Sequence, residues 1–141
     1  MRSTSVDHEL ASRLRHAIAR AARRLRQEAG TDLSASLTGA LATIERHGPL
    51  TPSELAVRER VQRPTVTRVV YRLEEAGLVT RAPDPTDRRS ALITIAPAGR
   101  ALLSAARTRK DVFLSERLDS LSAEDRATLE RAAALLEGLL E

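Results

Sequence analysis

The chain of 141 residues is 42% apolar and 30% charged, a composition typical of a folded globular protein. It has no cysteine, which excludes disulfides, thiolate metal sites and thiol redox chemistry. No apolar run reaches the ~18 residues that a membrane helix needs, and residues 1–7 lack the apolar region of a signal peptide. We therefore expect a cytoplasmic protein with no membrane partner.

The charge is spread unevenly along the chain, although the net charge is only +4. Residues 58–110 carry twelve Arg or Lys against five Asp or Glu, whereas residues 111–141 carry three against eight. A basic middle followed by an acidic end predicts that the middle binds a polyanion such as nucleic acid.

Two helices are predicted in the first third of the chain. Residues 7–29 place apolar side chains at helical spacing, and Gly30 is a typical helix end. The apolar stripe consists of Leu10, Leu14, Ala17, Ala21 and Leu25. The second helix is predicted over residues 34–47, because Gly48-Pro49 stops it.

A short helix and a longer one are predicted next. Thr51 and Glu54 form a capping-box pattern around Pro52, so a helix begins there. After a turn at residues 61–63, a helix is predicted over residues 64–76, ended by a glycine. Two helices joined by a tight turn are typical of a helix-turn-helix.

The helix over residues 64–76 has two distinct faces. The face that we expect to pack on the domain consists of Val66, Val69, Val70 and Leu73. The opposite face consists of Pro64, Thr67, Arg68 and Tyr71. That face is free to enter a major groove, where arginine can bind guanine, and the helix N-terminus near Arg63 and Thr65 favours a phosphate. The alternative is an ordinary amphipathic helix with a solvated basic face.

A β-hairpin is predicted after this helix. Residues 78–81 and 91–95 have strand composition, and residues 83–90 form a polar, proline-stiffened loop between them. Its tip holds Asp87, Arg88 and Arg89. Arginine is attracted into a narrow minor groove, and Asp87 could fix an arginine side chain through a charge-assisted pair. A plain solvated turn is the alternative, because the same residues are good turn formers.

Two further helices are predicted at the end of the chain. One begins at Pro97 and continues to about residue 120, and Ser122 caps the next. The apolar stripe of the last helix consists of Leu129, Ala133, Leu136 and Leu140. The stripes of the first and last helices are too apolar to face water, so we expect them to pair two copies of the chain. The alternative is that these helices fold back on their own domain.

The order of these motifs resembles the MarR family of bacterial transcription regulators. The resemblance rests on Pro64-Thr65-Val66-Thr67-Arg68, on the Leu-Glu-x-x-Gly-Leu-Val run at residues 73–79, and on Asp-x-Arg at residues 87–89. It implies that Pro64, Thr65, Thr67 and Arg68 face the major groove. It also implies that Arg89 enters the minor groove with Asp87 orienting it, and that the first helix and the last two helices form the dimer interface.

The sequence departs from the family pattern at two helix starts. The family commonly has Ser or Thr where Gln62 stands and Thr where Ala96 stands. Neither Gln nor Ala is a good helix cap. We therefore expect these two helix ends to lack side-chain capping, with the fold unchanged.

The predicted fold is α+β and mostly α, with a winged helix-turn-helix over residues 34–97 and dimerisation segments over residues 1–33 and 98–141. The predicted function is sequence-specific regulation of transcription, with repression as the family's commoner mode, by a homodimer on a pseudo-palindromic double-stranded operator. Its half-sites are expected about 10 bp apart. A sequence-nonspecific architectural DNA binder and a winged-helix protein-interaction module remain as alternatives.

Other partners and activities are predicted with less support from the residues. The family resemblance implies release by a small aromatic or amphipathic ligand, although the chain is poor in aromatic residues. No phosphate loop, nucleophile elbow or metalloprotease motif is present, so we expect no enzyme activity and no cofactor. His8 and His16 are eight residues apart on one helix, too far for a shared metal ion, so no metal site is predicted.

Overall fold

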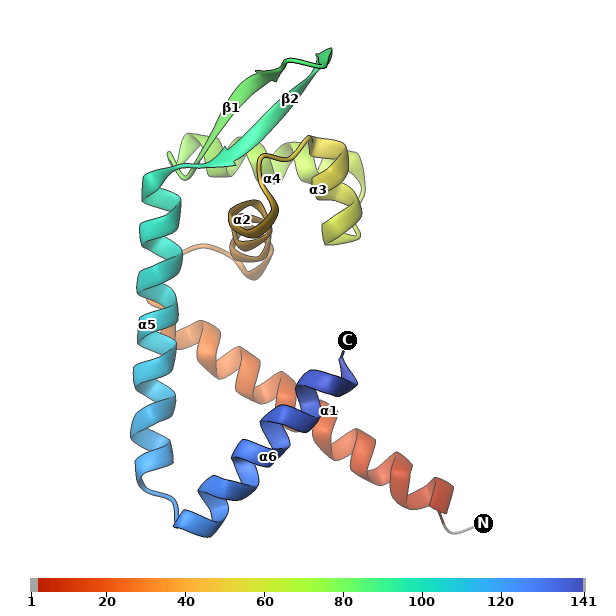
Figure 1. The fold of residues 1–141 in the computed structure, drawn as a ribbon, viewed down its shortest axis with the longest axis vertical. Helices are drawn as coiled ribbons and strands as arrows, with labels where there is room; N and C mark the ends of the chain where they lie inside the picture. The colour runs from red at the N-terminus through yellow and green to blue at the C-terminus, as the bar shows by residue number, and fades with distance from the viewer. Residues whose placement is uncertain (1–2, 141) are drawn as a thin grey trace.

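The computed structural model describes residues 3–140, so residues 1–2 and 141, at the ends of the two predicted dimerisation segments, lie outside it. The elements in chain order are α1 (Ser3–Glu28), α2 (Ala35–His47), α3 (Pro52–Glu59), α4 (Arg63–Glu75), β1 (Val79–Asp84), β2 (Asp87–Ile95), α5 (Pro97–Asp119) and α6 (Ala123–Leu139). Figure 1 shows the hairpin and α2–α4 at one end of α5, with α1 and α6 toward the other. The predicted class, mostly α with a small sheet, is confirmed.

The hydrophobic core lies between α2, α3, α4 and the base of the hairpin. Leu41 and Ile44 of α2, Leu55 of α3, Leu73 of α4 and Ile93 of β2 are fully buried. The predicted capping box begins α3, since Thr51 accepts from the Glu54 N–H and the Glu54 carboxylate accepts from the Thr51 N–H. These aliphatic contacts fix the angle between α3 and α4.

The hairpin is longer than the sequence pattern indicated. The predicted loop over residues 83–90 is wrong, because β1 runs to Asp84 and β2 begins at Asp87, leaving only Pro85 and Thr86 as the tip. The two strands pair from Val79 opposite Ile95 outward, with an irregularity near the tip. Polar residues continue the strand here because the backbone hydrogen bonds are supplied by the partner strand.

The helix ends mostly follow the sequence signals. Gly30 and Gly77 end α1 and α4 with positive φ angles of 65° and 71°. Gln62 and Ala96 make no side-chain cap hydrogen bond, as predicted from the departures from the family pattern. The start of α1 lies at Ser3 rather than at residue 7.

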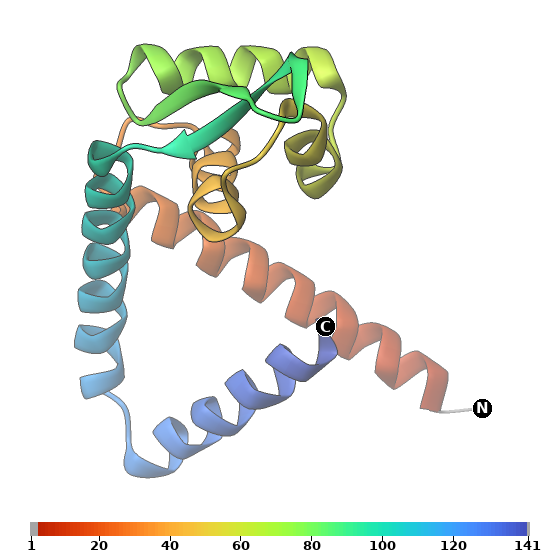
Figure 2. The ribbon, with the colours of Figure 1, turned by 45° about the horizontal axis from the view of Figure 1, so that its top comes forward.

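Helices α1, α5 and α6 form an open frame beside the domain (Figure 2). The Arg109 guanidinium of α5 donates to the carbonyl oxygens of Ala29 and Gly30, at 3.3 and 2.9 Å, and so holds the end of α1. None of the described helices is long and apolar enough to cross a membrane.

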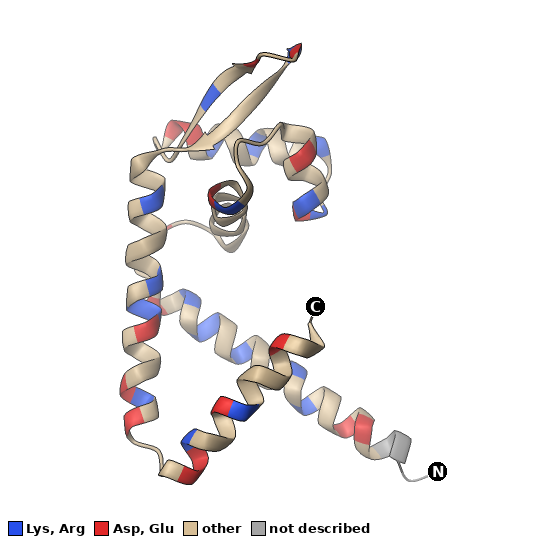
Figure 3. Cartoon of the chain, in the orientation of Figure 1, with Lys and Arg blue, Asp and Glu red and all other residues tan. Residues whose placement is uncertain are grey.

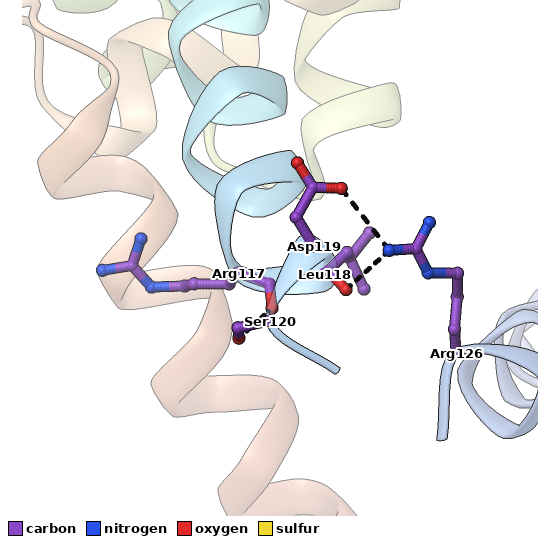
Figure 4. A network of polar contacts seen from close by, with 5 residues as sticks. All are labelled: Arg117, Leu118, Asp119, Ser120 and Arg126. Carbon is purple, nitrogen blue, oxygen red and sulfur yellow. Dashed lines mark hydrogen bonds and ion pairs between the residues drawn. The ribbon is translucent and has the colours of Figure 1, made fainter. Parts of the chain in front are cut away.

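The corner between α5 and α6 is held by hydrogen bonds (Figure 4). The Arg126 guanidinium donates to the Leu118 carbonyl oxygen at 3.0 Å and contacts the Asp119 carboxylate at 3.4 Å. Ser120 Oγ donates to the Arg117 carbonyl oxygen at 2.7 Å. These contacts fix the direction in which α6 leaves α5.

Candidate nucleic-acid interface

Helix α4 is packed on the domain by one face and exposed on the other. Val66, Val70 and Leu73 are buried, while Thr67, Arg68 and Tyr71 are exposed. Arg68 has no hydrogen-bond or ion-pair partner among the described residues. Its guanidinium is therefore available for a partner outside the chain.

The first turn of α4 is tied to α3. The Arg63 guanidinium donates to Ser53 Oγ in the first turn of α3. Thr67 Oγ1 donates to the Arg63 carbonyl oxygen at 3.1 Å, so its methyl group and not its hydroxyl proton is presented outward. The Ser53 contact fixes an exposed cation at the helix N-terminus, where an anion is also favoured by the free N–H groups.

Two aspartates shape the tip of the hairpin. The Asp84 carboxylate accepts from the Thr86 N–H at 2.9 Å and from its hydroxyl at 2.8 Å, and these bonds lower the pKa of Asp84. The Asp87 carboxylate accepts from the Arg89 N–H at 2.9 Å. The resemblance implied that Asp87 orients Arg89. In the structure its bond is to the Arg89 backbone, which sets the chain direction rather than the guanidinium.

An open groove of about 280 Å³ runs between α4 and the hairpin. Arg63 and Thr67 line it from α4, and Arg88 and Arg89 line it from β2. The structure thus brings together four of the predicted site residues from two separate segments of the chain. Their juxtaposition makes a strip of positive charge beside an exposed helix face, which suits a phosphate backbone.

One cation of this groove was missed from the sequence. Arg81 of β1 lines the same groove and contacts the Glu74 carboxylate at 3.2 Å. Strand alternation could have placed it on one hairpin face, but only the tertiary structure places that face toward α4. Arg81 is therefore a further candidate phosphate contact.

Comparison with known proteins places this geometry in a family. The model of the MarR family matches residues 33–91, the segment that contains α2–α4 and most of the hairpin. An HTH-type transcriptional regulator of Mycobacterium tuberculosis is 40% identical over 136 residues, which cover 96% of this chain and 95% of that protein. The chain belongs to the MarR family.

Solved structures agree with the family assignment. A Pseudomonas aeruginosa protein, solved as a candidate transcriptional regulator, is 33% identical with a TM-score of 0.88, covering 96% of each chain. FabT of Streptococcus pneumoniae, solved in complex with DNA, is 21% identical with a TM-score of 0.64, covering 97% of this chain and 96% of that one, and shows the shared fold. As a MarR-family protein, the chain is a DNA-binding helix-turn-helix transcription regulator and not an enzyme. Regulators of this family bind DNA and act as dimers.

Two of the predicted DNA-contact residues are placed differently from the rest. Thr65 is half-buried and lines a small cavity on the α2–α3 side of the MarR-type helix α4, together with Val66 and Val69. The Tyr71 hydroxyl donates to Glu75 at 3.0 Å, and that carboxylate raises the pKa of Tyr71. Pro64 is exposed at the start of α4, as expected.

The residues predicted for dimerisation are open to solvent within one chain. Leu10, Leu14, Leu129 and Leu140 are 52%, 37%, 48% and 78% exposed. Ala17, Ala21 and Ala133 are exposed as well, and Leu136 is half-buried. A single MarR-family protomer thus leaves both terminal stripes uncovered, instead of folding them onto its own core. Figure 3 shows that α1, which bears one stripe, also carries a row of basic residues.

Proposed function

We propose that this MarR-family protein is a homodimeric repressor of a pseudo-palindromic operator. The observation that carries the proposal is the groove between α4 and the hairpin, which joins an exposed helix face to clustered guanidinium groups. A two-fold dimer presents two such helices to successive half-sites, about 10 bp apart.

The residues of the interface take different roles in this proposal. Arg68, which has an exposed side chain without a partner among the described residues, reads a base edge in the major groove. Arg89, on the projecting hairpin, enters the minor groove. Arg63, Arg81 and Arg88, which line the groove between them, contact phosphates and set the register. Thr65 is assigned no base contact because it is half-buried.

The proposed organisation divides the chain into a DNA-binding unit, residues 34–97, and two dimerisation segments, residues 1–33 and 98–141. Support comes from the hydrophobic core, whose buried residues run from Ala40 to Leu103. Support for pairing comes from α6, in which no described residue is buried. Such a helix would gain its apolar contacts from a second copy.

A releasing ligand would bind near the junction of α1, α2 and α5. A cavity of about 550 Å³ there is lined by three cations, Arg23, Arg26 and Lys110, and by apolar groups that include Leu33 and Ala42. We propose that it takes a small amphipathic anion, with the carboxylate or phenolate on the cations. A library of aromatic carboxylates, assayed for release of bound DNA, tests this; release should be lost in Lys110→Met.

The first test is fluorescence anisotropy with the DNA upstream of the protein's own gene, with scrambled competitor, at two salt concentrations. Saturable binding that survives competitor at about 150 mM salt supports a sequence-specific regulator. Equal binding to all sequences with a steep salt slope would favour an architectural DNA binder. Absence of binding at low salt would favour the protein-interaction alternative.

A further inference from the structure

The exposed apolar stripes of α1 and α6 have the same spacing. On α1 the stripe is Leu10, Leu14, Ala17 and Ala21; on α6 it is Leu129, Ala133, Leu136 and Leu140. In each helix the steps are four, three and four residues, which is the repeat that lets two helices interlock along a seam. The two helices are therefore matched in apolar pattern, although they are separated by more than 100 residues of sequence.

The charges beside the two stripes are also matched, with opposite sign. Arg13 and Arg20 precede the second and fourth stripe positions of α1, while Glu130 and Glu137 follow the first and third positions of α6. Each pair is seven residues apart, which is about 10.5 Å along a helix. Charges that flank an apolar seam at this interval can pair across it, and they choose the partner helix.

These charged groups are open to a partner. All four side chains are exposed, and none forms an ion pair or side-chain hydrogen bond with another described residue. An open groove of about 830 Å³ follows this side of α1, lined by Arg13, Ala17 and Arg20 among others. Basic residues outnumber acidic ones six to three on α1, and acidic residues outnumber basic ones four to two on α6.

The α6 helix of the same chain does not cover this groove. No residue of the groove lining belongs to α6, and no described residue of α6 is buried. The Arg126 contacts with Leu118 and Asp119 fix the corner from which α6 leaves α5 (Figure 4). The acidic edge of α6 is therefore presented outward from its own protomer.

We propose that in the dimer α6 of one protomer lies on the basic groove of its partner's α1, with Glu130 and Glu137 paired to Arg13 and Arg20 of the other copy. The inference rests on the proposed homodimer and deepens it by naming the segment that each copy supplies. Two-fold symmetry gives the contact twice. The pairing is an electrostatic code by which this chain recognises a copy of itself among similar apolar helices.

Charge reversal tests the code with the full-length protein. One variant carries Arg13→Glu and Arg20→Glu, a second carries Glu130→Arg and Glu137→Arg, and a third carries all four changes. Because each reversal puts like charges across the interface, the first two should raise the dimer Kd by on the order of tenfold or more in sedimentation equilibrium. The third should return the Kd to near that of the unmodified chain, and so should a mixture of the first two, measured as heterodimer.

A cross-link tests the contact independently of the charges. The chain has no cysteine, so an Ala17→Cys protomer mixed with an Ala133→Cys protomer gives one defined pair of thiols. A short bis-maleimide should join them as a heterodimer, and Ala134→Cys, one position off the stripe, should react several-fold less. Circular dichroism confirms that each variant is folded.

The outcomes separate this inference from the proposed function. A dimer that binds operator DNA but shows neither the cross-link nor recovery in the four-change variant overturns the α1–α6 pairing and leaves the regulator intact. Recovery in the four-change variant without heterodimer formation in the mixture would place the contact within one chain, which also overturns it. Pairing as proposed without operator binding would contradict the proposed function alone.

Discussion

Gly99, in the first turn of α5, lies so close to Leu78 that a Cβ atom on it would stand 2.3 Å from the Leu78 carbonyl oxygen. That same oxygen accepts from the Ala96 N–H at 2.9 Å. The start of α5 is thereby fixed against the base of the hairpin. The angle between the frame helices and the DNA-binding unit depends on this one close backbone approach.

Gly99→Ala should therefore destabilise the protein by about 1–3 kcal/mol, because the methyl group meets backbone that cannot move away easily. Urea unfolding followed by circular dichroism measures the change. Gly39→Ala is the matched control, since its Cβ would meet only Glu59 Oε2, at 3.6 Å, in ordinary contact. That substitution should be neutral or stabilising by up to about 1 kcal/mol. Equal losses in both would contradict the role of the Leu78 contact.

Arg89→Ala should weaken operator binding by about 1–3 kcal/mol if the hairpin reaches into the minor groove. Arg131→Ala, a change of the same kind on exposed α6, serves as the control and should leave the affinity unchanged. Anisotropy titrations at one fixed salt concentration measure both. An unaltered affinity for Arg89→Ala would remove the hairpin tip from the mechanism.

Arg68→Ala should relax the sequence preference at one position of each half-site, because a base contact is lost and not a phosphate contact. A panel of operators with single base changes measures this. Arg81→Ala should instead lower the affinity for every sequence and reduce the steepness of the salt dependence. A uniform loss in Arg68→Ala would reassign it as a phosphate contact.

The tip of the hairpin should respond to acid through Asp84. Its bonds from Thr86 stabilise the carboxylate and lower its pKa, so they persist above the ordinary aspartate pKa and are lost as the pH falls through the lowered value. The NMR titration of the Thr86 amide should show a midpoint below that of an unperturbed aspartate. Thr86→Val, which keeps the N–H and removes the hydroxyl, should raise the midpoint part of the way. A midpoint that does not move would show that the hydroxyl contributes nothing.

The ion pair between Glu45 and Arg107 joins α2 to α5 at 2.6 Å, and the Arg107 hydrogen bond lowers the pKa of Glu45. Its stabilising effect should be present above the usual glutamate pKa and disappear as the pH falls through the lowered pKa. With half of the Arg107 side chain exposed, the effect should be within about 1 kcal/mol. The stability difference between the parent and Arg107→Gln, measured by urea unfolding, should shrink from about pH 7 to about pH 3. A constant difference would mean that Arg107 acts through packing.

Helix positions and faces were predictable because the signals are local. Thr51 and Glu54 marked a helix start, Gly77 marked an end, and the valines of α4 marked its buried face. The length of the hairpin was not predictable in this way. Arg88 and Ser90 belong to a strand because β1 pairs with them, and that pairing overrides their polar character.

The candidate site was predicted in outline and missed in its connections. The guanidinium groups of α4 and the hairpin could be proposed from the sequence, since the motif order places both in one unit. The bond from Arg63 to Ser53 and the approach of Arg81 to Glu74 depend on how the hairpin and α3 pack around α4. Contacts between segments that are distant in sequence leave no periodic signal in either segment.

The absence of buried residues in α6, among those the structure describes, has a thermodynamic consequence. A 17-residue helix with no tertiary support is only marginally stable in water. If a second copy supplies that support, folding of the C-terminal segment is linked to association, and its melting temperature rises with protein concentration. The amount of regulator in the cell would then set how much of it has an ordered C-terminus, so that newly made protomers complete their folding only on meeting one another.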